Sequence, residues 1–326
     1  MSQAAEQPVL EVTELRTHLF TRRGVGKAVD GVSFRLFAGK TLGLVGESGS
    51  GKSMTAVSVL QLQPRPAGRI VGGEIRFQGV NLLEKSDREM RAYRGRHISY
   101  IPQDPLSSLN PVFTIGEQLA EGLRIHLGMT GAAARERVVE LLKIMCIPSP
   151  EERVDAFPHQ LSGGTRQRVV SAMGISCNPE VLIADEPTTA LDVTVQAAYL
   201  DLLREIQRER GLAILFITHD FGIVANVCDD VAVMYAGRIV ERAPTRRLFA
   251  RPAHPYTQAL LESLPDPLAH AERLLAIPGQ PPSIFGRPAG CPFAPRCRHA
   301  EARCTEAYPP FVELGDGQGA ACWKLV

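Results

Sequence analysis

The chain has 326 residues, of which 44% are hydrophobic and 22% are charged, a balance typical of a globular protein rather than a disordered or fibrous one. Its 36 Lys and Arg side chains are offset by 35 Asp and Glu, which argues against a nucleic-acid partner. No run approaches the roughly 18 apolar residues of a membrane span, and the start lacks the profile of a secretory signal. The composition therefore favours a cytosolic protein that meets a membrane only through partners.

Strand-like and helix-like segments alternate along most of the sequence, which predicts an α/β fold around a largely parallel sheet. Residues 41–45 are expected to form a buried strand, which a glycine-rich turn over 46–53 joins to a helix over 54–62. Farther along the chain, the apolar segments 181–184 and 213–217 have the length of strands. The helical pattern between these two segments runs from Val193 to about Arg210, ends at Gly211 and fits a crossover helix.

The middle and the end of the chain depart from this alternation. Helical patterns near 114–126 and 132–145 have no strand between them, which predicts a helical insertion over about 105–165. Toward the C-terminus Pro and Gly become frequent, and little apolar sequence is left to form a core. We therefore expect a main domain over 1–250 and a loop-rich extension over 251–326 that something other than a large core holds together.

A phosphate-binding pattern, G-x-x-x-x-G-K-[ST], is matched by Gly46-Glu47-Ser48-Gly49-Ser50-Gly51-Lys52-Ser53. Glycines let backbone N–H groups turn inward around phosphate oxygens, and the helix that follows adds the positive end of its dipole. Lys52 would bring a positive charge to the β- and γ-phosphates, and the Ser53 hydroxyl could ligate Mg²⁺. The alternative is a chance glycine-rich turn, but the preceding strand and following helix favour the phosphate loop.

A second nucleotide motif follows the apolar strand 181–184, which ends in Asp185 and Glu186. Asp185 can hold Mg²⁺ through water, and Glu186 is placed to orient or deprotonate the attacking water. Alone, such a strand end would be unremarkable. Its order relative to the phosphate loop makes the functional interpretation the better one.

The segment Leu161-Ser162-Gly163-Gly164-Thr165 resembles the signature motif of ATP-binding cassette (ABC) proteins, although Thr165 replaces the commoner Gln. The remaining motifs of that family stand in the required order: Gln103 as the Q-loop, Ala190-Leu191-Asp192 as the D-loop and His219 as the switch histidine. The resemblance covers residues 9–250. It implies a P-loop NTPase fold, in which this chain forms an ABC-type nucleotide-binding domain with a helical insertion.

The resemblance also implies a site for ATP and Mg²⁺ that two chains share. Glu186 would polarise the water, His219 would contact the γ-phosphate, and Ser53 with Gln103 would complete the Mg²⁺ shell. Phe20 is the best candidate for stacking the adenine, with plain packing as the alternative. The implied ATP-binding residues are Phe20, Gly46, Ser48, Gly49, Ser50, Gly51, Lys52, Ser53, Met54, Gln103 and Asp185, joined in trans by Ser162, Gly163, Gly164 and Asp192 of a second chain.

Two further segments narrow the family: Asp104–Pro111, and His254–Leu261 followed by a four-cysteine tail. Together they resemble the ATPase subunits of oligopeptide/dipeptide importers, a family that includes nickel importers. This implies an ATPase on the cytoplasmic face of the membrane, bound peripherally to two permease subunits. A second, paralogous ATPase and an extracytoplasmic solute-binding protein would complete the importer. The alternatives are a nickel or other small-solute importer ATPase and a non-transport soluble ABC ATPase.

The seven cysteines divide into two groups. Cys146, Cys177 and Cys228 lie in apolar stretches and are expected to be small buried hydrophobes. The others crowd into the last 36 residues, where a reducing compartment favours metal ligands over disulfides. Their spacing lacks the C-x₂-C pairs of zinc sites, so we expect a [4Fe–4S] cluster, with zinc or four free thiols as alternatives. These cysteines are Cys291, Cys297, Cys304 and Cys322.

Overall fold

The computed structural model describes residues 7–189, 191–264 and 276–326. These residues fall into two compact units, each assembled from separate stretches of the chain. The first unit includes 36–40 and 84–216, and the second includes 10–35, 41–83 and 217–326. The boundary expected at residue 250 stays a prediction.

Three strands form the sheet of the first unit, in the order β8-β7-β6. β6 and β7 are parallel, and Ile98 lies opposite Val181. Every residue of β7 is buried, as its apolar sequence predicts for a central strand. The strands are β6 (Ile98–Ile101), β7 (Val181–Asp185) and β8 (Ala213–Thr218).

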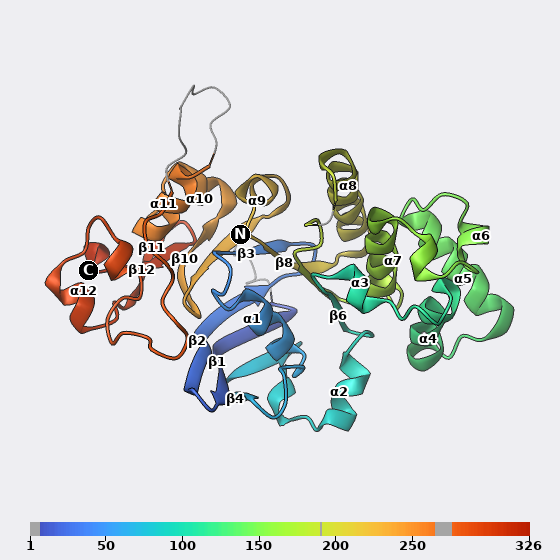
Figure 1. Ribbon diagram of the computed structural model, residues 1–326, viewed down its shortest axis with the longest axis horizontal. Helices are drawn as coiled ribbons and strands as arrows, with labels where there is room; N and C mark the ends of the chain where they lie inside the picture. The colour runs from blue at the N-terminus through green and yellow to red at the C-terminus, as the bar shows by residue number, and fades with distance from the viewer. Residues whose placement is uncertain (1–6, 190, 265–275) are drawn as a thin grey trace, which may run out of the picture. The chain divides into compact units, whose positions relative to one another are not determined.

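Helices make up most of the first unit, and α3, α4 and α5 pack on α7 (Figure 1). No strand lies between residues 105 and 165, all of which have a described backbone, so the helical insertion is confirmed as a structural feature. α8 also has its predicted ends, because the Asp192 side chain caps its first turn and Gly211 ends it in the left-handed conformation. The helices are α2 (Asp87–Tyr93), α3 (Pro105–Ser108), α4 (Ile115–Leu127), α5 (Gly131–Ile144), α6 (Pro150–Arg153), α7 (Gly163–Ile175) and α8 (Val193–Arg210).

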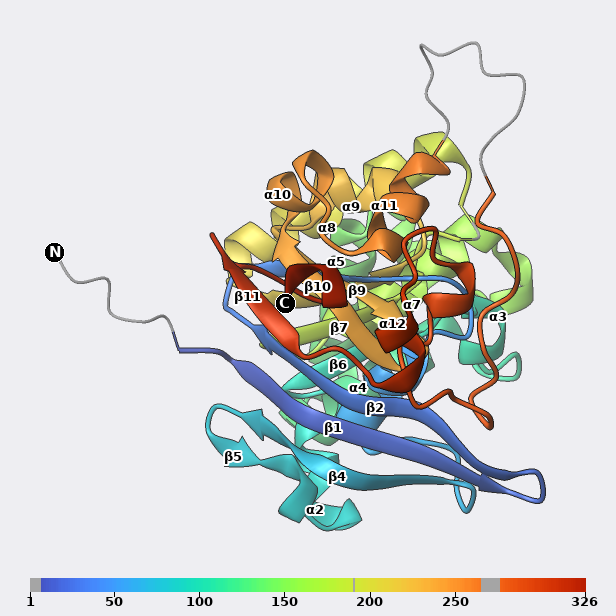
Figure 2. The ribbon, with the colours of Figure 1, turned by 90° about the vertical axis from the view of Figure 1, so that its left-hand side faces the viewer.

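The second unit contains an antiparallel sheet that the sequence analysis missed, with strand order β2-β1-β4-β5. Figure 2 shows β1, β2 and β4 side by side. The alternation of buried and exposed residues breaks in β1, where Glu14 has a φ of 49° and the register against β4 shifts. A period-two search therefore fails there. The strands are β1 (Leu10–Thr21), β2 (Gly24–Leu36), β4 (Gly68–Phe77) and β5 (Val80–Asn81).

The other strands of the second unit follow the order β11-β12-β10-β9-β3. β3 is parallel to β9, whereas the pairs β9–β10, β10–β12 and β11–β12 are antiparallel. The C-terminal extension thus supplies the outermost two strands, and Ala320 and Ala321 of β12 are buried. Strand pairing with β10 therefore holds this part of the extension, whereas the sequence analysis expected a loop-rich segment. The strands are β3 (Thr41–Val45), β9 (Asp230–Tyr235), β10 (Arg238–Pro244), β11 (Phe311–Gly315) and β12 (Gln318–Ala321).

Short helices complete the second unit, and no helix in the described parts of the chain is long and apolar enough to cross a membrane. The α-helices are α1 (Lys52–Val59), α9 (Phe221–Val227), α10 (Thr245–Ala250), α11 (Pro255–Glu262) and α12 (Ala302–Glu306). The 3₁₀ turns of the described residues are η1 (Leu82–Glu84), η2 (Pro158–Gln160), η3 (Ala294–Arg296) and η4 (Trp323–Leu325).

The isolated cysteines behave only partly as expected. Cys177 and Cys228 are buried, but Cys146 is exposed, so the prediction for Cys146 is wrong. Cys146 follows the last turn of α5 with a φ of 51°, in the left-handed position that commonly ends a helix. An apolar neighbourhood in the sequence does not reveal that its side chain leaves the core there.

Candidate functional site

The loop over residues 46–53 connects β3 to α1 and can close only with glycine at two positions. A Cβ on Gly46 would lie 2.1 Å from the Met234 carbonyl oxygen, and one on Gly51 would lie 2.4 Å from that of Ala28. Both glycines also have positive φ angles, of 153° and 108°. The tight path brings the loop against the turn between β9 and β10, where Gly237 donates its N–H to the Ser50 carbonyl at 2.7 Å.

Lys52 extends over this loop rather than into solvent. Its side chain is buried, and Nζ donates to the carbonyls of Gly46 at 2.7 Å and Glu47 at 3.1 Å. The buried Ser50 hydroxyl has no hydrogen-bond partner among the described residues, and Ser53 is exposed in the first turn of α1. A helix N-terminus, a lysine and an unsatisfied hydroxyl suit a phosphate group.

In the first unit, the two carboxylates at the C-terminal end of β7, Asp185 and Glu186, are held by specific donors. The Tyr100 hydroxyl donates to Asp185 Oδ2 at 3.0 Å, and burial together with Asp185 raises the pKa of Tyr100, so the phenol stays a donor. Gln103 Nε2 and Thr189 Oγ1 both donate to Glu186 Oε2, at 3.0 and 3.1 Å. Glu186 has a φ of 46°, a left-handed conformation that is uncommon for a non-glycine residue. Gln103 and Glu186, predicted from separate motifs, thus lie together.

The signature motif forms the start of α7. Ser162 caps this helix, and its Oγ accepts from the Thr165 N–H at 3.3 Å and hydrogen-bonds the Thr165 hydroxyl at 2.9 Å. A Cβ on Gly164 would lie 3.5 Å from the Leu191 side chain, so the signature motif adjoins the D-loop. Ala190 of that loop lies outside the described residues. Gly163 has open space where a Cβ would project, which leaves its backbone accessible.

The remaining candidates belong to the second unit. His219 is exposed between β8 and α9, directly before Asp220, whose carboxylate caps α9. Phe20 is 38% exposed on β1, and the Arg69 guanidinium carbon lies 5.0 Å from its ring centroid. Phe20 is therefore not a core residue. Whether it stacks an adenine stays a prediction.

Sequence reasoning missed several side chains that support the phosphate-binding loop. Arg296 binds the Glu47 carboxylate, and the Tyr256 hydroxyl accepts a hydrogen bond from the Glu47 N–H at 2.9 Å. Glu47 and Arg296 are 249 positions apart, so no local spacing could have revealed the pair. Tyr256 belongs to a segment that the sequence analysis noted only for its family resemblance.

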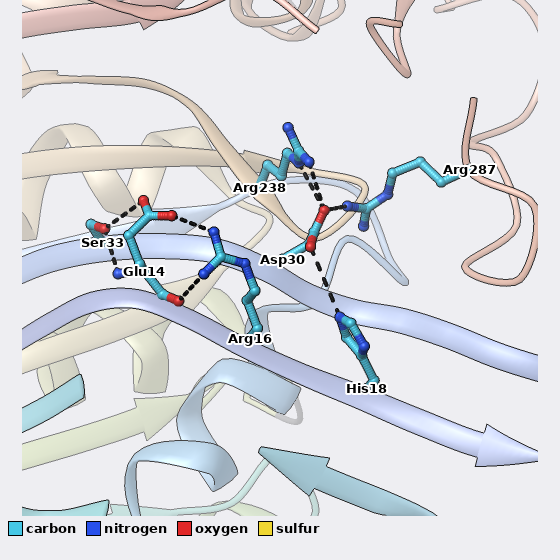
Figure 3. Close-up of polar contacts among 7 residues, drawn as sticks. All are labelled: Glu14, Arg16, His18, Asp30, Ser33, Arg238 and Arg287. Carbon is cyan, nitrogen blue, oxygen red and sulfur yellow. Dashed lines mark hydrogen bonds and ion pairs between the residues drawn. The ribbon is translucent and has the colours of Figure 1, made fainter. Parts of the chain in front are cut away.

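A second missed cluster centres on Asp30 of β2 (Figure 3). Asp30 Oδ2 accepts from Arg287 at 2.6 Å and from Arg238 at 2.7 Å, and the side chains of Asp30 and Arg287 are each only 8% exposed. Burial raises the pKa of Asp30, but the Arg238 hydrogen bond and the two positive charges outweigh it and hold this pKa below its usual value. The cluster ties the extension to β2 and β10.

The four C-terminal cysteines line a single cavity of about 20 Å³, together with residues that include His254 and Phe293. Burial raises the pKa of the Cys291 thiol to about 11 and also raises the pKa values of Cys297 and Cys322, which disfavours the thiolate form. Within the described residues, no group of three or more His, Cys, Asp or Glu side chains is arranged to hold a metal ion. The predicted gathering of the cysteines is present, but the described residues form no ready-made metal site.

Comparison with known families gives two matches along the chain. Residues 29–189 match the ABC transporter family, and residues 240–304 match the C-terminal region of oligopeptide/dipeptide transporters. Both matches agree with the order of the motifs described above. The first covers the phosphate-binding loop, Gln103, the signature motif and the Asp185–Glu186 pair.

Curated relatives are similar over nearly the whole chain. A probable peptide ABC transporter ATP-binding protein of Sinorhizobium fredii is 50% identical, with 97% of this chain and 95% of the relative covered. The dipeptide transport ATP-binding protein DppD of Bacillus subtilis is 46% identical with the same coverage. The oligopeptide transport ATP-binding protein OppD of Bacillus subtilis is 48% identical, with 97% and 89% covered.

Solved structures show the same fold. The chain is similar to cbiO1 of Clostridium perfringens, part of the ABC transporter complex cbiONQ, with 28% identity and a TM-score of 0.64 over 76% of this chain and 92% of that one. It is also similar to the dimeric bacterial ABC transporter cassette MJ0796, with 25% identity and a TM-score of 0.66 over 73% and 99%.

Proposed function

The chain belongs to the ABC transporter family as an ATPase with an oligopeptide/dipeptide C-terminal region, and from this premise we propose that it powers the import of di- or oligopeptides. The observation that carries the proposal is the 46–50% identity to peptide and dipeptide transport ATP-binding proteins over 97% of the chain. Nothing in this subunit needs to touch the peptide, so the substrate class follows from the relatives.

We propose that ATP is bound by the loop over 46–53, with Lys52 facing the β- and γ-phosphates. Phe20 would stack the adenine, and Met54 follows Ser53 in the first turn of α1. Ser53, Gln103 and Asp185 would hold Mg²⁺, which neutralises charge that develops on the phosphates. His219 would contact the γ-phosphate. The residues of the loop that would line the phosphates are Gly46, Ser48, Gly49, Ser50 and Gly51.

Glu186 would activate the attacking water. Its Oε2 accepts hydrogen bonds from Gln103 and Thr189, which fix the direction of the carboxylate before the water arrives. A carboxylate oriented in this way can take the proton of the water as the water oxygen bonds to the γ-phosphorus and the bond from that phosphorus to the departing ADP oxygen breaks. We expect Glu186→Gln to bind ATP with nearly unchanged affinity but to lower single-turnover hydrolysis at least about 100-fold. Hydrolysis at the wild-type rate would remove Glu186 from this role.

The second half of each ATP site would come from a second ATPase subunit, a paralogue of this chain. Ser162, Gly163 and Gly164 at the start of α7, with Asp192 at the start of α8, would face the γ-phosphate bound by the partner. The open space above Gly163 supports an approach of this kind. A Ser162→Arg chain that keeps full activity with its natural partner would contradict the shared site.

We further propose that the ATPase pair binds two permease subunits at the cytoplasmic face of the membrane, where a solute-binding protein delivers the peptide from outside. The helical insertion would receive the permeases. The test is the complete importer in proteoliposomes. Peptide-loaded binding protein should stimulate ATP hydrolysis and peptide uptake together, and Glu186→Gln should abolish both. Stimulation by nickel chelates alone would show that the substrate is a nickel chelate rather than a peptide. Full ATPase activity in the absence of the permeases would contradict coupling to transport.

We propose a [4Fe–4S] cluster, rather than zinc, for the four cysteines of the extension. The single cavity that all four line supports the proposal, but the thiols would have to be drawn together, because the present geometry holds no ready metal site. Such a cluster would supply structural cross-linking or redox sensitivity and takes no part in the ATP chemistry. Anaerobically purified protein should be brown, with about four irons per chain. One zinc per chain would assign the site to zinc, and neither metal would mean free thiols.

A further inference from the structure

Glu47 of the phosphate-binding loop is held by an arginine of the C-terminal extension. Arg296 Nη1 donates to Glu47 Oε2 at 2.7 Å and Nη2 donates to Oε1 at 2.9 Å, a bidentate pair that fixes the orientation of the carboxylate. The Arg296 side chain is only 5% exposed, and its Nε donates to the Pro278 carbonyl at 2.9 Å. An arginine anchored in this way cannot follow Glu47 if the loop moves.

The extension also contacts the backbone of the loop. The Tyr256 hydroxyl accepts from the Glu47 N–H at 2.9 Å, and this buried ring packs on Tyr235 and Phe293, with ring centroids 4.5 and 5.3 Å apart. The packed Tyr256 ring therefore fixes the orientation of the Glu47 N–H, near the start of the loop. Both contacts act on Glu47, which is not among the ATP-binding residues that the family resemblance implies.

A third contact works through the turn between β9 and β10. Arg287 donates to the Ala236 carbonyl, and at 2.8 Å to the Lys27 carbonyl, while Asp30 fixes its guanidinium (Figure 3). The next residue of the turn, Gly237, donates to the Ser50 carbonyl at 2.7 Å. Arg287 thus stabilises the turn on which the phosphate-binding loop rests.

We propose that Tyr256, Arg287 and Arg296, here called the extension clamp, are positioning residues that set the affinity of the phosphate-binding loop for ATP. The loop contains three glycines and would sample many conformations if it were unsupported. Holding Glu47 and the turn below Ser50 reduces the entropy that ATP binding must remove. The clamp rests on the proposed function, because it presupposes that ATP binds this loop.

The test measures MgATP binding to the full-length chain by calorimetry. Arg296→Gln should raise the Kd at least about tenfold, and Arg296→Lys should recover part of the loss because it restores the charge without the bidentate geometry. The matched control is Arg298→Gln. Arg298 makes a bidentate pair with Glu262 at 2.9 and 2.5 Å, but its side chain is 59% exposed and the pair does not include the loop. Arg298→Gln should change the Kd less than twofold.

Two further measurements separate positioning from a general structural effect. In the assembled importer, Arg296→Gln should raise the KM for ATP about tenfold and leave kcat within about twofold, since the water-activating groups are not touched. Glu47→Gln and the double variant should bind ATP about as weakly as Arg296→Gln, because one interaction is lost in all three. Additive losses in the double variant would contradict the clamp.

Tyr256→Phe keeps the test valid if Arg296→Gln does not fold, since it removes one hydroxyl and leaves the ring packing intact. It should raise the Kd about threefold to tenfold in a chain that stays folded, with a melting temperature lowered by the loss of one hydrogen bond. A wild-type chain that binds no MgATP would overturn the proposed function itself. Wild-type binding, together with an unchanged Kd in folded Arg296→Gln or Tyr256→Phe, would overturn the clamp alone.

Discussion

The phosphate-binding loop and the C-terminal extension lie in the same compact unit, but they reach their structures by opposite routes. The loop is a contiguous run of eight residues, and its Lys52 side chain donates to the carbonyls of Gly46 and Glu47 within the same run. The extension depends on partners far away in the chain, such as Asp30 for Arg287 and β10 for β12. A contiguous motif can be identified from the amino-acid sequence, whereas contacts between distant segments can be identified only from the structure.

The largest effect should come from breaking a long-range attachment of the extension. Asp30→Ala would leave the buried Arg287 guanidinium without its carboxylate, and we expect the free energy of unfolding to fall by about 3 kcal/mol. Urea denaturation monitored by circular dichroism would measure it. Glu14→Ala is the matched control in the same region (Figure 3), because Glu14 pairs with Arg16 but is 56% exposed and should cost less than about 1 kcal/mol. Equal losses in both variants would contradict the importance of burial.

A substitution within the phosphate-binding loop should instead have a large effect on ATP binding and a small effect on the free energy of unfolding. Lys52→Ala deletes the charge that faces the phosphates, so we expect MgATP binding to weaken about 100-fold, measured by calorimetry. The free energy of unfolding should change by only about 1 kcal/mol, since the two carbonyls that Lys52 contacts can bind water instead. Lys143→Ala, which removes an exposed partner of Glu151, should alter neither quantity. Unchanged ATP binding in Lys52→Ala would remove Lys52 from the site.

The same contrast explains how much the sequence predicted. β3, β7, β8 and α8 were located to within about two residues, because apolar runs and helix caps are local signals. The antiparallel sheet was missed since the bulge at Glu14 breaks the alternation in β1. The last two strands were missed because they are five and four residues long, and β12 reads Gln-Gly-Ala-Ala, with no strand-forming side chain.

The residues of the candidate site also divide into those found in local motifs and those that form long-range pairs. Gln103 and Glu186 were identified from family motifs, and the structure places them 3.0 Å apart. Arg296, Arg287 and Asp30 were not identified, since the pairs that they form span hundreds of residues and involve no catalytic motif. The arrangement of the four C-terminal cysteines was predicted only in part. Their number and crowding predicted that they would meet, but not how closely their thiols would approach.

Acid should lower the free energy of unfolding through protonation of Asp30, by less than the Asp30→Ala substitution does. Its pKa is held below the ordinary value of 3.8, so the unfolded chain takes up this proton first as the pH falls. The stabilisation is complete above pH 3.8 and is lost as the pH falls through the folded-state pKa. Over this interval, the free energy of unfolding should decline more steeply in the wild type than in Asp30→Asn. Parallel curves would show that Asp30 does not titrate as described.

The smallest effect is expected at Cys146. Because its side chain is exposed, Cys146→Ser should change the free energy of unfolding by less than about 0.5 kcal/mol in urea denaturation. Cys177→Ser, which places a hydroxyl in a buried position, should cost about 1–2 kcal/mol. A large loss at Cys146 alone would mean that this cysteine is buried after all.

The contact between Glu47 and Arg296 also has a consequence for the synthesis of the protein. Ribosomes add about 5–20 residues per second, so the 249 positions between the two residues correspond to a delay of roughly 10–50 s. During that interval the phosphate-binding loop has already left the ribosome, but the side chains that brace it do not yet exist. The last segment to be translated completes one of the first, so an unfinished or C-terminally truncated chain carries an unbraced nucleotide loop, and full ATP affinity becomes a property of the finished polypeptide.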